Sequence, residues 1–316
     1  MNLNLPAFLL QTALLLLLSP LVTGCIRNWK AKLQNRRGPR VWQPYFDLAK
    51  CLRKDRVISE HASWIFSAAP CVLFFSSLLA GLMTPLVTTS PPLSLFGDAL
   101  AVVGLLALGR FFLALGGLDP ASAFGGMGSS REMSIAAVAE PALMLSIFTV
   151  AIGAGSTDLG RIVTVAQGPG WQLLAPAHLM AFAALFVVLL AETGRIPVDN
   201  PATHLELTMI HEAMLLEYSG RDLALMEWGA SVKQLVLMAI LSNIFVPIGL
   251  ATGHSISDLA LGLAVFVAKI LLLSAGVVLV ETVNAKLRLF RVPDLLSAAF
   301  VLATLALFST FLFGIK

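Results

Sequence analysis

Long apolar segments recur along the whole chain and constrain its fold more than any other feature. Hydrophobic residues make up 58% of the 316 residues and charged residues only 12%, against about 25% charged residues in a typical soluble domain. A helix that crosses a bilayer needs about 20 mostly apolar residues. The apolar segments predict eight such spans, at about 3–26, 63–87, 98–118, 133–153, 174–194, 232–252, 258–281 and 294–315. We therefore expect an all-α, polytopic membrane helical bundle, with residues 1–316 forming a single integral membrane domain.

The N-terminal apolar segment is expected to stay in the protein as its first helix. It lacks a positively charged start and a small-residue cleavage site, and it is as long as a full span. The three cysteines, Cys25, Cys51 and Cys71, show no metal-ligand spacing. No iron–sulfur or nucleotide-binding motif is found either, so we expect no metal and no cofactor in this chain. Any redox centre would lie on partner subunits.

Basic residues gather in the loops of one side. The first loop holds ten lysines and arginines between Arg27 and Arg56, whereas the opposite loops hold Arg161 and the terminal Lys316. By the positive-inside rule the basic side is cytoplasmic. The cytoplasmic loops would then be about 27–62, 119–132, 192–231 and 282–293, with both termini on the other side. This pattern predicts a multi-pass protein of the cell inner membrane.

The densest group of ionisable residues lies between Glu192 and Gly220. This stretch holds five carboxylates, two histidines and an arginine beside two apolar segments. Charges beside a bilayer are costly and are functional-site candidates. Glu192 and Arg195 are three residues apart and can pair on one helix face, and Thr203 with Glu206 has the spacing of a capping box. Candidate coupling acids here are Glu192, Asp199, Glu206, Glu212 and Glu217.

Three further charges, Arg110, Glu140 and Lys269, fall inside predicted spans. Burying any of them without a partner would cost at least ~2.5 kcal/mol. Each therefore needs an opposite charge or a water-filled cavity, and Pro141 weakens the helix directly after Glu140. Static ion pairs and a hydrated proton path both satisfy this requirement. Glu281, at the end of the seventh span, can snorkel to the interface.

The first loop contains an expected interfacial helix from Trp42 to Lys54, with aromatic residues toward the headgroups and basic residues toward a partner or phosphates. Simple topogenic charge explains this loop as well as a docking surface does. The glycine-rich segment 119–132 is expected to be a loop, with Ser129 or Ser130 capping a helix that begins near Glu132. Candidate docking residues are Arg36, Arg37, Arg40, Asp47 and Arg131.

Three segments in order carry a resemblance to a known family. They are QNRRGPR…WQPYFDLAK, GRFFLALGGLDPASAFGGMGSSREM with Glu140-Pro141 after it, and ETGRIPVDNP…LEL…EYSG. These segments resemble the NADH dehydrogenase subunit 1 superfamily of respiratory complex I. Within it, the chain is most similar to the formate hydrogenlyase subunit 4 branch, the membrane anchors of group 4 nickel–iron hydrogenases. The resemblance covers nearly the whole chain.

The resemblance implies a non-catalytic membrane anchor that docks a soluble electron-transfer arm and links redox chemistry to proton or sodium movement. Its implied partners are the hydrogenase large and small subunits, a ferredoxin-like iron–sulfur subunit and an antiporter-like membrane subunit, which would carry the nickel–iron and iron–sulfur centres. The implied coupling acids are Glu140 and the five acids of the 192–220 stretch, with Arg110, Arg195 and Lys269 as counter-charges.

The same stretch also departs from the respiratory pattern. Gly194 stands where the family usually has Asn, and Ala202 and His204 stand where acids are usual. About three residues are inserted before Glu217. These changes count against a quinone site. The alternatives are a quinone-chamber subunit of a proton-pumping NADH dehydrogenase and a purely structural anchor.

Overall fold

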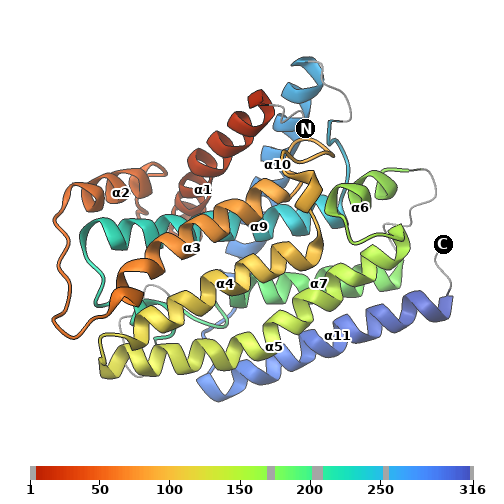
Figure 1. The fold of residues 1–316 in the computed structure, drawn as a ribbon. Helices are drawn as coiled ribbons and strands as arrows, with labels where there is room; N and C mark the ends of the chain where they lie inside the picture. Colours follow the sequence, from red (N-terminus) through yellow and green to blue (C-terminus); the bar gives the residue numbers. More distant parts are fainter. Residues whose placement is uncertain (1–4, 169–174, 201–208, 252–255, 314–316) are drawn as a thin grey trace.

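The computed structural model describes residues 5–168, 175–200, 209–251 and 256–313 and is almost entirely helical (Figure 1). Among these residues, seven helices are long and apolar enough to cross a membrane, and a shorter apolar helix, α7, brings the number to the expected eight. The long helices are α1 (Leu5–Leu33), α3 (Trp64–Met83), α4 (Ala99–Leu118), α5 (Ala123–Ala154), α9 (Gly220–Phe245), α10 (Ile256–Val283) and α11 (Val292–Phe313). The shorter helices are α2 (Gln43–Arg53), α6 (Leu159–Ala166), α7 (Pro176–Glu192) and α8 (His211–Leu215), with 3-10 turns η1 (Ser94–Phe96) and η2 (Leu289–Arg291). The prediction of an all-α, polytopic bundle is confirmed.

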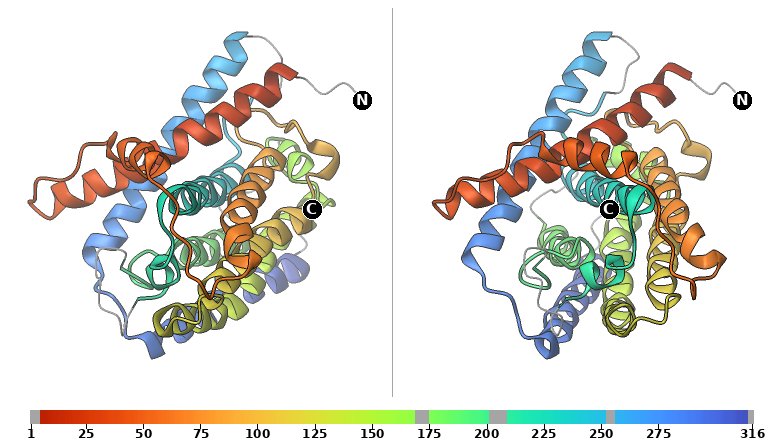
Figure 2. Two further views of the ribbon diagram at one scale, coloured as in Figure 1. Left: turned by 60° about the vertical axis from the view of Figure 1, so that its left-hand side comes forward. Right: turned by 90° about the vertical axis from the view of Figure 1, so that its left-hand side faces the viewer.

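The helices form a main bundle with a flanking pair. In the bundle α3 packs on α4 and α9, and α5 packs on α4, α7 and α11. The pair α1 and α10 crosses beside α9 on one flank, with α2 next to α1 (Figure 2). Because α10 and α11 expose most of their apolar side chains, their outer faces contact lipid or other membrane subunits.

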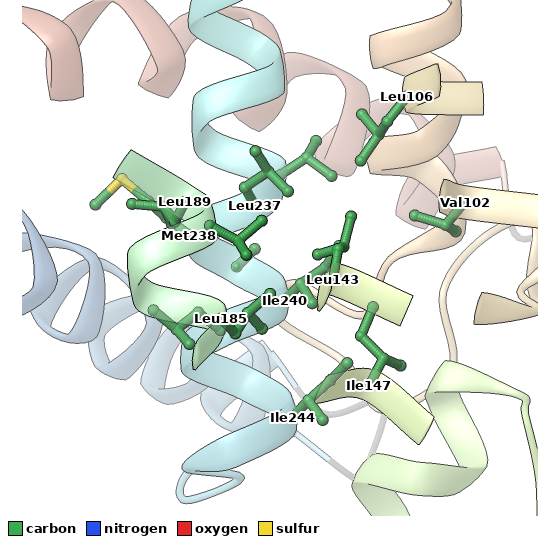
Figure 3. Close-up of a cluster of buried hydrophobic side chains, with 14 of the residues drawn as sticks. Val102, Leu106, Leu143, Ile147, Leu185, Leu189, Leu237, Met238, Ile240 and Ile244 are labelled. Atoms are coloured by element: carbon green, nitrogen blue, oxygen red, sulfur yellow. The ribbon is translucent and has the colours of Figure 1, made fainter. Parts of the chain in front are cut away.

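Helix α9 passes through the centre of the bundle. From Val232 to Phe245 every residue of α9 is buried, as expected for a helix surrounded by others. Figure 3 shows Leu237, Met238, Ile240 and Ile244 of α9 against leucines and isoleucines of α5 and α7 and apolar residues of α4. This apolar layer separates the two ends of the bundle.

The two ends carry different connections. At one end, here called the distal end, the α3–α4, α5–α6 and α9–α10 connections meet: Ala99 N donates to Thr157 O at 2.9 Å, and Thr88 pairs with Ala251. The other end, here called the charged end, gathers the segments 34–63, 119–122, 193–219 and 284–291. Most of the candidate residues lie at or near the charged end.

Two element boundaries differ from expectation. Residues 123–132 were expected in a glycine-rich loop but form the first turns of α5, which Ser122 caps by accepting from Gly125 N at 3.2 Å. The glycines here serve close packing, because a Cβ on Gly125 would lie 2.1 Å from Gly117 O. Ser129 is not a cap, since it lies within α5 and donates to Ala114 O at 2.9 Å.

The second difference concerns the central helix, which was expected to begin near residue 232. Helix α9 begins twelve residues earlier, at Gly220. Gly220 has a φ of 55°, and a Cβ there would lie 2.4 Å from Asp55 O. The expected helix over Trp42–Lys54 is confirmed as α2.

Candidate functional site: a chain of buried charges beside a cavity

Arg110 of α4 is the centre of a group of buried carboxylates. Its side chain is only 3% exposed. Nη1 donates to Glu140 Oε1 of α5 at 2.9 Å, and Nη2 contacts Glu192 Oε2 at the end of α7. Nε lies 3.7 Å from Glu132 Oε1, one further carboxylate of α5. The helices α5 and α7 therefore direct three acids at one guanidinium.

Lys233 and Gln234 of α9 extend this group across the bundle. Lys233 Nζ lies 2.8 Å from Glu192 Oε2, so that Glu192 is shared by two cations. The neighbouring Gln234 accepts a hydrogen bond from Arg195 Nη2 at 2.9 Å. Two consecutive residues of α9 thus connect the Arg110 group to a second group of charges.

The second group is centred on Glu281 of α10. Its carboxylate oxygens lie 3.2 Å from Arg195 Nη1 and 2.8 Å from Lys30 Nζ of α1. We call the two groups together the charge chain, which joins helices α1, α4, α5, α7, α9 and α10 and the loop after α7. It has four cationic and four anionic members: Arg110, Lys233, Arg195, Lys30, Glu132, Glu140, Glu192 and Glu281. The equal numbers satisfy the requirement that buried charges be paired.

The end of α7 determines which partners Glu192 and Arg195 find. Gly194 adopts a φ of 58°, a left-handed conformation that ends the helix. Arg195 is turned out of the helical line and reaches Glu281, while Glu192 stays on α7 and reaches Arg110. The expected pairing of Glu192 with Arg195 is therefore wrong. A helical i, i+3 pair would have required α7 to continue.

Asp199 organises the loop that follows. Its Oδ1 lies 2.7 Å from Lys286 Nζ, and its Oδ2 accepts from the backbone N–H groups of Ile210 and His211 at 3.2 and 3.3 Å. These contacts fix the start of α8 against the α10–α11 connection. Asp199 thus has a clear structural role.

A cavity of about 580 Å³ lies alongside the charge chain. Helices α1, α2, α4, α8, α9 and α10 and the end of α7 contribute to its wall. Its ionisable lining residues are Arg27, Lys30, Arg36, Arg37, Asp47, Arg110, Glu192, Arg195, Asp199, His211, Glu212, Glu227, Lys233 and Glu281. A polar cavity of this size holds water, which gives the charge chain a route for proton exchange.

The structure brings together most of the acids singled out in the sequence. Glu140 and Glu192 belong to the charge chain, and Asp199 and Glu212 line the cavity. Glu217 lies outside the cavity lining and is exposed. Glu206, with Thr203 and the capping box proposed for them, lies outside the described residues.

The expected docking residues divide in the same way. Arg36, Arg37 and Asp47 line the cavity, whereas Arg40 is exposed beyond it. Arg131 donates from Nη1 to Met209 O at 2.8 Å and so holds the segment before α8. Its described contacts are therefore internal.

Lys269 lies away from the acids to which it was assigned as a counter-charge. It lies about 18 Å along α10 from Glu281, at about 1.5 Å per residue. Its ammonium donates to Val246 O at 2.6 Å and to Asn243 Oδ1 at 3.2 Å, near the distal end. Lys269 thus binds neutral oxygens at the end of α9.

Four members of the charge chain were not among the candidate residues: Lys30, Glu132, Lys233 and Glu281. Lys233 had been placed in a loop or at the very start of a span because the start of α9 was set twelve residues too late. Glu281 was expected to snorkel, but it is 2% exposed and faces inward. The available signal was that Lys233-Gln234 interrupts an otherwise apolar segment.

Tyr218 explains the Glu217–Gly220 part of the family motif as packing. Its ring stacks on Phe66 with centroids 4.0 Å apart, and its hydroxyl donates to Phe66 O at 3.2 Å. Burial raises the pKa of the phenol, which keeps it neutral. A Cβ on Gly116 would lie 2.2 Å from the Tyr218 oxygen, so the glycine makes this contact possible.

No group of three or more His, Cys, Asp or Glu side chains with metal-binding geometry occurs in the described part of the chain. The chemistry that the site offers is proton exchange and ion pairing.

Comparison with known proteins agrees with this architecture. The family model for NADH dehydrogenase matches residues 5–312. The chain is 36% identical to hydrogenase-4 component C of Escherichia coli K12 over 94% of this chain and 93% of that protein. It is 35% identical to formate hydrogenlyase subunit 4 of the same organism, over 95% and 97% respectively.

More distant relatives belong to the same family. A membrane subunit of the NADH-quinone oxidoreductase of Rubrobacter xylanophilus is 30% identical, over 67% of this chain and 63% of that protein. A chain from the structure of the membrane-bound sulfane sulfur reductase, an archaeal respiratory membrane complex, superposes with a TM-score of 0.83. That match is 21% identical in sequence and covers 98% of this chain and 99% of that one, so it supports the fold. The resemblance seen in the three sequence segments is confirmed: this multi-pass membrane protein belongs to the NADH dehydrogenase family.

Proposed function

We propose that this chain is the membrane-anchor and ion-coupling subunit of a hydrogenase-type, complex I-like oxidoreductase of the cell inner membrane. It does not itself carry out the redox reaction. The similarity to hydrogenase-4 component C and formate hydrogenlyase subunit 4 supports the type of complex. The charge chain beside the cavity is the observation that carries the coupling role.

The coupling step would begin at Glu192. Its Oε2 is shared by Arg110 and Lys233, whereas its buried Oε1 has no hydrogen-bond partner among the described residues. A carboxylate in this position is ready to take up a proton. Protonation would weaken its attraction to both cations.

The released cations would then pair elsewhere in the charge chain. Arg110 already contacts Glu140 and lies near Glu132, so a small movement would strengthen those pairs. Lys233 lies next to Gln234, which binds Arg195. A protonation change at one carboxylate therefore alters pairing across several helices, as a coupling device must. The transported ion would be a proton or sodium, and Asp199 and Glu212 would serve proton exchange in the cavity.

The charged end would bind the soluble electron-transfer arm. Arg36, Arg37 and Asp47 lie at the cavity, and Arg40 and the other basic residues of the 27–62 loop are available beside it. The proposed partners are hydrogenase large and small subunits and a ferredoxin-like iron–sulfur subunit, with an antiporter-like subunit inside the membrane. In the same proposal this end is cytoplasmic and both termini lie on the opposite side.

Purified complex in sealed vesicles tests the coupling role. Glu140→Gln and Glu192→Gln variants should assemble, turn over and move fewer ions per turnover than the wild type. Glu217→Gln, an exposed acid outside the cavity lining, is the matched control and should retain the wild-type ratio. Full ion movement in both test variants would leave only the anchoring role.

A further inference from the structure

A second cavity lies on the opposite side of α2 from the charge chain. It is an open groove of about 670 Å³ on the outer face of the corner between α1, α2 and α10. The α1 wall runs from Leu10 to Leu21, α2 and the residue before it contribute three aromatic rings, and α10 contributes Leu263 and Val267. Nearly all of its surface is apolar, so the groove suits a hydrocarbon chain.

The length of the groove matches one leaflet of a bilayer. From Leu10 to Leu21 the α1 wall is about 16 Å long at about 1.5 Å per residue. Half of the ~30 Å hydrocarbon core is ~15 Å. Leu17, in the middle of this wall, is 63% exposed. A single acyl chain aligned with α1 would cover it.

Helix α2 supplies a polar end for such a chain. Trp42, Tyr45 and Phe46 line the groove, and Trp and Tyr rings typically sit at the headgroup level of a membrane. Lys50 and Arg53 follow on the same side of α2, four and seven residues after Phe46, and both are exposed. Basic side chains at this level attract anionic headgroups.

The groove is held in shape by the α1–α2 contact. Pro20 cannot donate to Leu16 O within α1, and Trp228 Nε1 donates to that carbonyl at 3.2 Å instead. The Tyr45 hydroxyl donates to the next carbonyl, Leu17 O. A Cβ on Gly24 would lie 2.0 Å from Val41 O, so glycine allows the loop before α2 to pack against α1.

We propose that this groove binds an anionic diacyl phospholipid, with one acyl chain along α1 and its phosphate at Lys50 and Arg53. The opposite face of α2, through Pro44, Asp47 and Leu48, forms part of the wall of the charged cavity. A lipid bound here would therefore support that wall. The inference stands on the groove and on α2 alone, and it does not depend on the proposed coupling role.

The test uses the protein purified from membranes in mild detergent, alone and in its intact complex. Dioleoyl phosphatidylglycerol, dioleoyl phosphatidylcholine and soluble glycerol phosphate are added in turn, and binding is followed by native mass spectrometry and by Tm. Phosphatidylglycerol should be retained about tenfold more tightly than phosphatidylcholine and should raise Tm. Glycerol phosphate should do neither.

Two variants separate the acyl and headgroup contacts. Ala13→Trp fills the groove at an exposed position, and Lys50→Gln with Arg53→Gln removes the charges; each should lower phosphatidylglycerol retention about tenfold. The matched controls are Leu272→Trp, on the exposed face of α10 outside the groove, and Lys32→Gln with Arg288→Gln. Both controls should bind as the wild type does.

Three results would overturn the proposal. One is equal retention of both lipids, and another is unchanged retention in the filled-groove variant. The third is that, in the intact complex, a membrane subunit rather than lipid protects Leu17 and Phe46 from labelling.

Discussion

Lys233 and Lys269 sit in the same bundle, and their different surroundings distinguish its two ends. Lys233 of α9 contacts the carboxylate of Glu192 within the charge chain. Lys269 of α10 donates to a backbone carbonyl and to an amide oxygen near the distal end. The first lysine balances a charge that can vary, whereas the second satisfies the end of a helix. A buried lysine is therefore assigned a coupling role from its partners, and the position of its Cα in a span is not enough.

Removing the centre of the charge chain should have the largest effect. Arg110→Met leaves Glu140, Glu132 and part of the Glu192 charge without their cation. Breaking a buried ion pair on one side costs about 3–5 kcal/mol, and we expect the upper end of that range. Thermal unfolding of the detergent-solubilised protein and its yield measure the loss. Adding Glu192→Gln to Arg110→Met should restore part of it, and no recovery would show that the two side chains do not interact.

Exchanging each lysine for methionine tests the comparison directly. Lys233→Met should cost about 3 kcal/mol, because Glu192 keeps Arg110 but loses its second cation. Lys269→Met should cost about 1 kcal/mol, because only hydrogen bonds to neutral oxygens are lost. Unfolding of the two variants under identical conditions gives both values. Equal losses, or a larger loss for Lys269→Met, would contradict the assignment of the two ends.

The loop after α7 allows a finer test. Gly194→Ala places a side chain at a φ of 58°, which should cost about 1 kcal/mol and disturb the Arg195–Glu281 pair more than the Glu192–Arg110 pair. A double-mutant cycle between Arg195→Met and Glu281→Gln, made with and without Gly194→Ala, measures that coupling energy. An unchanged value would mean that the left-handed turn is not needed to place Arg195.

The smallest effect is expected at the exposed acid of the same stretch. Glu217→Gln should change stability by no more than about 0.5 kcal/mol, as is usual for surface substitutions. The same unfolding assay measures it. A loss comparable to that of Lys233→Met would place Glu217 in a buried pair and weaken the division between the cavity and its surroundings.

The sequence predicted the helical bundle and the acids that matter better than it predicted their partners. Apolar segments identify spans because the bilayer requires them. Pairing depends on helix ends, and these were misplaced where glycine acts through tertiary contact: Gly125 lets α4 and α5 approach, and Gly220 starts α9 early. The partner of Arg195 depends on the reversal at Gly194. Such close approaches are not visible without the neighbouring helix.

The central claim is that carboxylates of the charge chain change protonation when the complex turns over. Redox-induced infrared difference spectroscopy of the purified complex measures this directly through the carbonyl stretch of protonated carboxylic acids. The account predicts a difference band in the wild type that is lost in Glu192→Gln or Glu140→Gln and retained in Glu217→Gln. A band that persists in both charge-chain variants, or the absence of any carboxylic-acid band in the wild type, would contradict it.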